Sequence, residues 1–337
     1  MIDYIHARIK CPHKLFGKII RYIDPETGEI NDYSQKLDLK NEMENIRVKS
    51  MNYGAMLSIS GNPLSFLQQH NLFGSNNLLG LIYEVFKMVT GILGIEVDEL
   101  TAQDVRAGDY ELYRVDSAFN FRMPNNDLVK KVVREIAWCW FEQNKHVSTY
   151  KDQTAYLNQH SKFWALKFYA KYQQMISSGM THPSKEQLLE YASAIVRGEL
   201  TLRRPELIDR ELNKGSDWAG ISLPKKLLIE AIDQSGLTGD VKLRLVPDEV
   251  QELSAALKRI YIAWTHGESI KELYGPANYY RIVGDFKALG IDVSLPPHKA
   301  RARQVKLMDL LVEENITTFP RYARNKRLNF IPDKLSV

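Results

Sequence analysis

The stretch TAYLNQHSKFWALKFYAK, residues 154–171, sets the pattern from which the fold can be worked out. Two apolar and aromatic runs flank the turn-forming residues 158–161, which is typical of a β-hairpin. The second run holds Tyr169 and ends at Lys171. A phenol beside an ammonium group is a candidate nucleophile for a phosphodiester, with the lysine holding the phosphate. The two side chains share a strand face if the strand extends that far. The alternative is a structural strand tyrosine, one of 17 tyrosines in the chain.

Two acidic residues stand alone in other strand-like runs. Asp116 follows Arg114 by two positions in residues 110–122, and Glu199 follows Arg197 by two positions near residue 200. A carboxylate that faces a protein core is costly unless it is paired. Asp116 and Glu199 therefore have two interpretations. Each carboxylate either faces water or pairs with the nearby arginine, or the two belong to a mixed-charge site on one face of the sheet. Carboxylates of such a site would hold a metal ion that neutralises phosphate charge.

The segments around these runs predict an α+β domain in which helices pack on an antiparallel sheet. Period-two alternation and turn residues predict strands or hairpins at residues 2–10, 17–30 and 45–60. Broad apolar stripes predict helices at 64–96, from about 125 to 142, and at about 185–193. We expect this catalytic domain to cover residues 1–205.

The last third of the chain has helical periodicity instead. Residues 224–235, 247–266 and 300–315 predict helices, after a boundary near 205–225. Residues 257–337 carry 14 Lys and Arg against 8 Asp and Glu, a net charge of +6, whereas the whole chain has +4. We expect residues 225–337 to form a helical, basic, DNA-binding region, although a solvated basic surface is the alternative. Its candidate DNA-binding residues are Tyr280, Arg281, Arg301, Arg303, Arg324 and Lys326.

Composition excludes several classes of protein. The 337 residues are 44% hydrophobic and 26% charged, and no apolar run reaches the roughly 18–20 residues that span a bilayer. The first residues read as a strand rather than a secretory signal, and the two cysteines have no metal-binding or disulfide spacing. We therefore expect a cytoplasmic protein with no membrane partner. The sequence has no P-loop, no dinucleotide-binding glycine motif and no GxSxG elbow, so it predicts neither an ATP-driven motor nor a serine hydrolase.

His70 is the one histidine in a suggestive position, within the polar segment 67–74. Its imidazole is a candidate metal ligand or phosphate contact, and a capping or surface histidine is the alternative. The chain has no His-hydrophobic-His triplet, the usual metal clamp of many tyrosine-dependent nicking enzymes.

Four blocks of sequence, taken together, resemble the replication initiators of filamentous phages, the gene II protein family. They are residues 60–74, the Arg-x-Asp run 113–119, the Tyr-x-Lys hairpin 161–171 and the Arg-x-Glu run 196–200. The blocks occur in the family's order, and a weaker fifth block covers 274–292. One departure is Gln173-Gln174, where the family often has a glutamate.

The resemblance implies a site-specific nicking and joining enzyme for rolling-circle replication. Its members cut one strand of the supercoiled origin, keep the 5′ phosphate on a tyrosine and leave a 3′ hydroxyl for a host polymerase. Tyr169 would be that tyrosine and Tyr156, on the partner strand, its backup. Asp116, Glu199 and His70 would hold Mg²⁺ or Mn²⁺, and Arg114 and Arg197 would contact DNA. Single-stranded DNA and a host helicase are further expected partners. The rival hypothesis is a non-catalytic DNA-binding regulator whose residues 275–290 form a helix-turn-helix.

Overall fold

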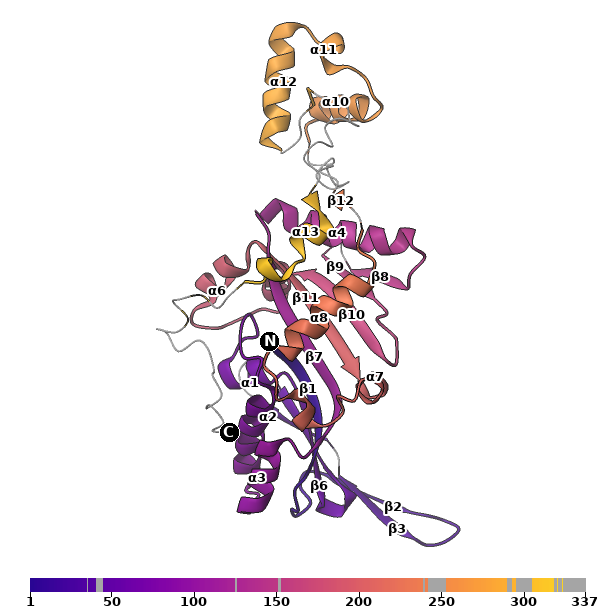
Figure 1. Cartoon of the computed structure of the whole chain (residues 1–337), viewed down its shortest axis with the longest axis vertical. Helices are drawn as coiled ribbons and strands as arrows, with labels where there is room; N and C mark the ends of the chain where they lie inside the picture. The colour runs from indigo at the N-terminus through magenta and orange to yellow at the C-terminus, as the bar shows by residue number, and fades with distance from the viewer. Residues whose placement is uncertain are drawn as a thin grey trace. The chain divides into compact units, whose positions relative to one another are not determined.

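A computed structural model of the chain divides into two compact units, Met1–Leu237 with Leu311–Val337, and Thr238–Leu310 (Figure 1). The structure describes residues 1–34, 36–40, 45–124, 126–150, 153–238, 240–241, 253–289, 293–294, 305–317, 320 and 323. Four candidate DNA-binding residues lie outside these ranges: Arg301, Arg303, Arg324 and Lys326. Residues 247–252 and 300–304, the first parts of two predicted helices, lie outside them as well.

The first unit is built on one nine-stranded antiparallel sheet with the order β4-β5-β6-β1-β7-β11-β10-β9-β8. Its strands are β1 (Ile2–Lys10), β4 (Leu37–Lys40), β5 (Asn45–Met51), β6 (Met56–Gly61), β7 (Glu111–Arg122), β8 (Val147–Tyr150), β9 (Thr154–Leu157), β10 (Trp164–Ala170) and β11 (Ile195–Arg203). A separate hairpin joins β2 (Ile19–Ile23) to β3 (Ile30–Ser34). The predicted α+β class is thus confirmed.

Helices cover the apolar face of this sheet. Helix α4 (Asn126–Glu142) packs against β9, β10 and β11, and α8 (Leu223–Gln234) packs against β7 and β11. Phe168 lies at the centre of this layer, its ring centroid 6.4 Å from that of Phe121 and 6.0 Å from that of Trp140. Gly198 lets the rings meet, because a Cβ atom there would lie 2.9 Å from Phe168 and 3.0 Å from Phe121. The opposite face carries the polar residues of the central strands.

The helix predicted at 64–96 is two helices, α1 (Pro63–Gln68) and α2 (Leu78–Leu93). The Asn62 side chain caps α1 by accepting a hydrogen bond from the Ser65 amide at 2.9 Å. At its end, Gln69 adopts a left-handed backbone conformation with φ of 63°. Residues 70–77 are therefore not helical. The Asn71 and Leu72 carbonyls accept hydrogen bonds from Arg197 of β11 and Asn120 of β7.

The first unit also contains the α-helices α3 (Glu99–Ala107), α5 (Lys171–Ser177), α6 (Lys185–Ala192) and α7 (Arg204–Asp209). No helix in the described ranges is long and apolar enough to cross a membrane. Helix α8, which the sequence placed in the C-terminal region, packs on the sheet and belongs to the first unit. The boundary between the compact units therefore follows residue 237. That the N-terminal part catalyses nicking and the C-terminal part binds DNA stays a prediction.

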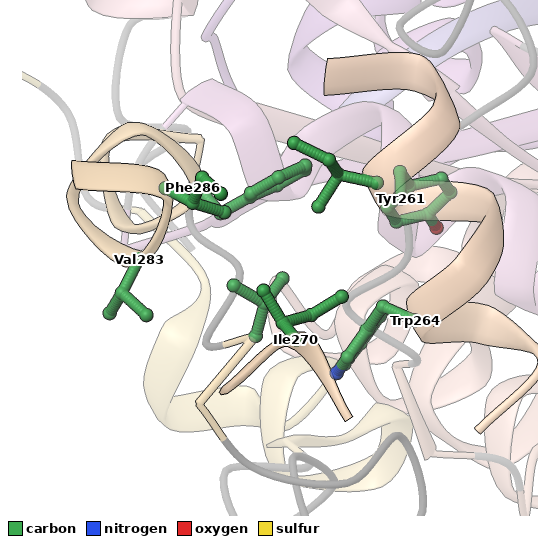
Figure 2. Close-up of a cluster of buried hydrophobic side chains, with 8 residues drawn as sticks. Tyr261, Trp264, Ile270, Val283 and Phe286 are labelled. Atoms are coloured by element: carbon green, nitrogen blue, oxygen red, sulfur yellow. The ribbon is translucent and has the colours of Figure 1, made fainter. Parts of the chain in front are cut away.

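The second unit is small and mainly helical, with α10 (Ala255–Thr265), α11 (Ile270–Leu273), α12 (Pro276–Ala288) and α13 (Leu307–Leu310). Its core contains Tyr261, Trp264, Ile270, Val283 and Phe286, which converge from α10, α11 and α12 (Figure 2). A two-stranded pair, β12 (Asp240–Val241) with β13 (Val305–Lys306), joins the two ends of this segment.

Candidate active site on the polar face of the sheet

Strand register places the predicted site residues of β7, β10 and β11 on one face. Residues directly opposite each other in an antiparallel pair project to the same side. Asp116 lies opposite Thr201, and the next residue along that face of β11 is Glu199. On β10, Lys167 lies opposite Glu199 and Tyr169 lies opposite Arg197. The arrangement gathers acids, a phenol and two cations from three neighbouring strands.

Two β-bulges add residues to this face. The β1–β7 register passes over Asp3, between the pairs Ile2–Ser117 and Tyr4–Asp116, so β1 has one extra residue there. It also passes over Tyr113, so β7 has one extra residue at that point. A bulge re-aims a side chain that simple alternation would send to the other face. Asp3 is thereby able to meet Arg197 of β11.

Asp3 is the most heavily hydrogen-bonded carboxylate of the site. Its Oδ1 accepts from Arg197 Nη2 at 2.7 Å, from Asn71 Nδ2 at 2.9 Å and from Asn62 Nδ2 at 3.0 Å. Burial opposes its ionisation, but Arg197 and the interaction with Glu199 outweigh burial and hold the pKa of Asp3 well below its usual range. Asp3 is therefore a fixed negative charge inside the cluster.

Glu199 is the carboxyl group that interacts with Asp3. Burial raises the pKa of Glu199, and the charge of Asp3 raises it further, although Lys167 acts in the opposite direction. The Lys167 Nζ donates to Glu199 Oε2 at 3.0 Å. Glu199 thus lies between a carboxylate and an ammonium group.

Asp116 is buried, with 3% of its surface exposed, and is paired along its own strand. Arg114 Nε donates to Asp116 Oδ1 at 2.8 Å, and Arg114 Nη2 contacts Oδ2 at 2.5 Å. Burial raises the pKa of Asp116 in spite of this ion pair. The pairing considered from sequence is therefore present, in a buried setting rather than a solvated one.

Tyr169 is 4% exposed and lies among the cations of the site. Lys167 Nζ is 4.2 Å from the Tyr169 ring centroid, and Arg197 lies opposite Tyr169 on the neighbouring strand. Burial raises the pKa of Tyr169, while Arg197 and Lys167 act to lower it. Tyr156 on β9 lies opposite Lys167, whose Nζ is 5.3 Å from its ring centroid. Both candidate tyrosines therefore border the same lysine.

Lys171 does not extend the strand face of Tyr169, because β10 ends at Ala170 and Lys171 begins α5. Its side chain is fully buried, and its Nζ donates to Asn71 Oδ1 and Gln174 Oε1, each at 2.8 Å. Burial, and then the charge of Arg197, lower the pKa of Lys171 well below its ordinary value. Lys167 is therefore closer to the Tyr169 ring than Lys171 is. Gln174, one of the two glutamines that replace the family's glutamate, accepts a hydrogen bond from Lys171.

The His70 ring packs with two other rings, its centroid 4.7 Å from Phe73 and 5.6 Å from His182. Within the part of the chain that the structure describes, no three or more His, Cys, Asp and Glu side chains form a group able to hold a metal ion. The predicted trio of His70, Asp116 and Glu199 is therefore not such a group. The Asp3–Glu199 pair does fit the oxygen ligands that Mg²⁺ and Mn²⁺ prefer, since Mg²⁺ is often bound by one or two carboxylates plus water and phosphate.

The candidate DNA-binding residues divide between the two units. Arg114 and Arg197 lie in the site and are bound to Asp116 and Asp3. Tyr280 and Arg281 lie on α12 of the second unit, where Tyr280 is 73% exposed and Arg281 pairs with Asp285 at 3.3 Å.

Sequence reasoning missed Asp3 and Lys167 as members of the site. Asp3 sits at the start of a run that reads as an ordinary strand, and a bulge leaves no signal in a single sequence. Lys167 could have been found, since it lies two residues before Tyr169 and period-two alternation puts both on one face.

Comparisons with known proteins agree with the motifs. Residues 1–221 match the family model for the N-terminal part of the phage replication-associated protein, the gene II protein. The replication-associated protein of Enterobacteria phage I2-2 is 26% identical over 309 residues, covering 88% of each chain. A solved rolling circle replication initiator protein from Geobacillus stearothermophilus is 13% identical, with a TM-score of 0.27. The match covers 63% of this chain and 77% of the other.

Proposed function

The chain belongs to the phage replication-associated gene II protein family, and from this membership we propose that it is a rolling-circle replication initiator that nicks origin DNA through Tyr169. The observation that supports Tyr169 most is its place opposite Arg197, beside Lys167, on the face that holds Asp3, Asp116 and Glu199.

The proposed reaction is a reversible phosphoryl transfer. The Tyr169 oxygen attacks the scissile phosphorus, the bond to the 3′ oxygen breaks, and the 5′ phosphate stays on the tyrosine. The phenol gives up one proton and the departing 3′ oxygen takes one. A 3′ hydroxyl of the displaced strand reverses the transfer when it rejoins the ends. The phosphotyrosine bond conserves the energy of the phosphodiester, so no ATP site is required.

The residues around Tyr169 suit the charges that this reaction develops. Arg197 lies opposite Tyr169, and its charge favours the ionised form of the phenol. Lys167 faces the same ring and contacts Glu199, so it is placed to stabilise added charge on the phosphate. Lys171 contributes indirectly. Its Nζ donates a hydrogen bond to Asn71, and the Asn71 side chain donates one to Asp3. We assign Lys171 a positioning role.

Asp3 and Glu199 are the proposed holders of Mg²⁺ or Mn²⁺, and Asp116 on the strand between them, paired with Arg114, adds a further carboxyl group to the same face. A bound divalent cation would polarise the scissile phosphate and offset its charge. His70 is not included in this ligand set, because its ring packs with Phe73 and His182.

The proposed substrate is the supercoiled double-stranded origin, with single-stranded DNA as the form that is rejoined. The enzyme would work in the bacterial cytoplasm with a host helicase and a host polymerase. Incubation with supercoiled origin plasmid and Mg²⁺ tests the proposal. A nicking enzyme converts the plasmid to open circles, whereas the rival DNA-binding regulator only shifts its mobility.

A further inference from the structure

A second group of side chains lies on the polar face beside Asp116, and the proposed nicking chemistry uses none of them. We define this Tyr113 surface by six residues of β1, β7, β11 and α7: Tyr4, Arg8, Tyr113, Arg114, Arg203 and Arg204. All six are partly exposed.

Guanidinium groups stack on both tyrosines of the Tyr113 surface. Arg8 Cζ is 3.7 Å and Arg204 Cζ is 4.0 Å from the Tyr113 ring centroid. Arg114 Cζ is 4.5 Å from the ring centroid of Tyr4. The bulge in β7 makes the first stack possible, because it turns Tyr113 toward β1. Such stacks hold flat, charged groups in fixed positions.

Three guanidinium nitrogens of the Tyr113 surface have unused hydrogen-bonding capacity. Arg8 Nε, Arg203 Nη1 and Arg204 Nη1 are each buried and have no hydrogen-bond partner among the described residues. A buried donor without a partner is unfavourable, and native proteins rarely keep one without cause. Phosphate oxygens are well suited to accept from guanidinium groups.

The Tyr113 surface also carries excess positive charge. Its four arginines meet two carboxylates of the described chain, Asp116 at Arg114 and Glu111 at Arg204, which leaves a net charge of +2. His6 lies between Tyr4 and Arg8 on β1. Burial lowers the pKa of His6 to about 4, and Arg8, Lys36 and Arg114 contribute to the shift.

We propose that the Tyr113 surface binds single-stranded DNA next to the nicking site. Arginine donors would hold phosphates, and unstacked bases would lie on the arginine–tyrosine stacks, a mode that paired bases cannot use. The inference deepens the proposed nicking function and rests on it, since the nicked strand must be held as a single strand beside Asp116. In this proposal the first unit binds the single-stranded DNA, and the basic residues of the second unit do not.

Fluorescence anisotropy with the full-length protein tests this surface. The probe is a fluorescein-labelled single-stranded oligonucleotide of mixed sequence, in EDTA so that no metal-dependent cleavage takes place. The variants are Tyr113→Ala, Tyr113→Phe and Arg8→Ala. The matched control is Arg106→Ala, because Arg106 stacks on Tyr83 at 4.6 Å but lies on α3. Circular dichroism confirms that each variant folds.

We expect Tyr113→Ala to raise the Kd by about tenfold, Tyr113→Phe to retain most of the affinity and Arg106→Ala to change little. Arg8→Ala should reduce the slope of log affinity against log salt by about 0.7 for each phosphate that it no longer binds. The proposal is overturned if Tyr113→Ala and Arg8→Ala bind as tightly as Arg106→Ala. Tyr169→Phe should bind normally in this assay. A failure of Tyr169 to form an adduct would therefore overturn the nicking proposal alone.

Discussion

Glu199 and Asp3 form an interacting pair of buried carboxyl groups, although β7 separates their strands in the sheet. Ala118 lies opposite Glu199 on that intervening strand, and its small side chain leaves room for the contact. Two ionised, adjacent carboxylates are the form that a divalent cation binds.

This relationship predicts a pH-dependent metal affinity. Because the pKa of Glu199 is raised, its proton must leave before Mn²⁺ binds, so affinity should climb as pH rises above the ordinary glutamate pKa of about 4.3. Titration calorimetry with Mn²⁺ at several pH values, in buffers of different ionisation enthalpy, should show proton release on binding.

Glu199→Gln and Asp3→Asn are the matched variants for that titration, since each removes charge with little change of volume. Both should weaken Mn²⁺ binding by at least about tenfold, and Glu199→Gln should abolish the proton release. Unchanged affinity and proton release in Glu199→Gln would place the metal elsewhere.

Asp116→Asn should remove metal-dependent nicking without unfolding the domain. The change keeps the shape of the side chain but removes the charge that Arg114 neutralises. Conversion of supercoiled origin DNA to open circles measures the effect, and thermal unfolding verifies the fold. Nicking at the wild-type rate in Mg²⁺ would show that the Asp116 charge has no part in the reaction.

Arg197→Ala should destabilise the first unit strongly. Arg197 is fully buried and pairs with Asp3, so its removal leaves a buried carboxylate without its cation. Breaking such a pair typically costs about 3–5 kcal/mol. Denaturant unfolding measures the change. Arg281→Ala, which removes an exposed pair with Asp285, should cost no more than about 1 kcal/mol. Equal effects of the two variants would contradict the structural role of Arg197.

The second unit should supply salt-dependent affinity for duplex origin DNA. Asp240 lies opposite Lys306 and Val241 opposite Val305, so an Asn-Gly turn between Val241 and Val305 can replace residues 242–304. The shortened protein should still cleave a single-stranded origin oligonucleotide but bind duplex origin poorly. Its salt slope should fall by about 0.9 for each phosphate that it no longer binds. Equal slopes and equal duplex affinity would place duplex capture on the first unit.

The sequence predicted the sheet well because its signals are local. Alternation and turn residues located β1, β7, the β9–β10 hairpin and β11, and the order of the motifs identified the family. The break between α1 and α2 escaped prediction, since it depends on Gln69 in a left-handed conformation within a largely apolar segment. Of the predicted site residues, Asp116, Glu199 and Tyr169 share one face of the sheet, and their roles stay predictions.

The remaining site residues depend on features that pairing between distant strands creates. Asp3 reaches Arg197 only because β1 is bulged against β7, and Lys171 leaves the strand only because β10 ends one residue earlier. Alternation within one segment carries no information on either event.

The central claim is that Tyr169 forms the covalent bond to DNA. Its most direct test uses an origin oligonucleotide with a label on the 3′ side of the nick, incubated with protein and Mg²⁺ and run on a denaturing gel. The wild type and Tyr156→Phe should give a labelled protein band, and mass spectrometry should place the nucleotide on Tyr169. Tyr169→Phe should bind the DNA with unchanged affinity and give no such band. An adduct that survives in Tyr169→Phe and vanishes in Tyr156→Phe would contradict this claim and assign the nucleophile to β9.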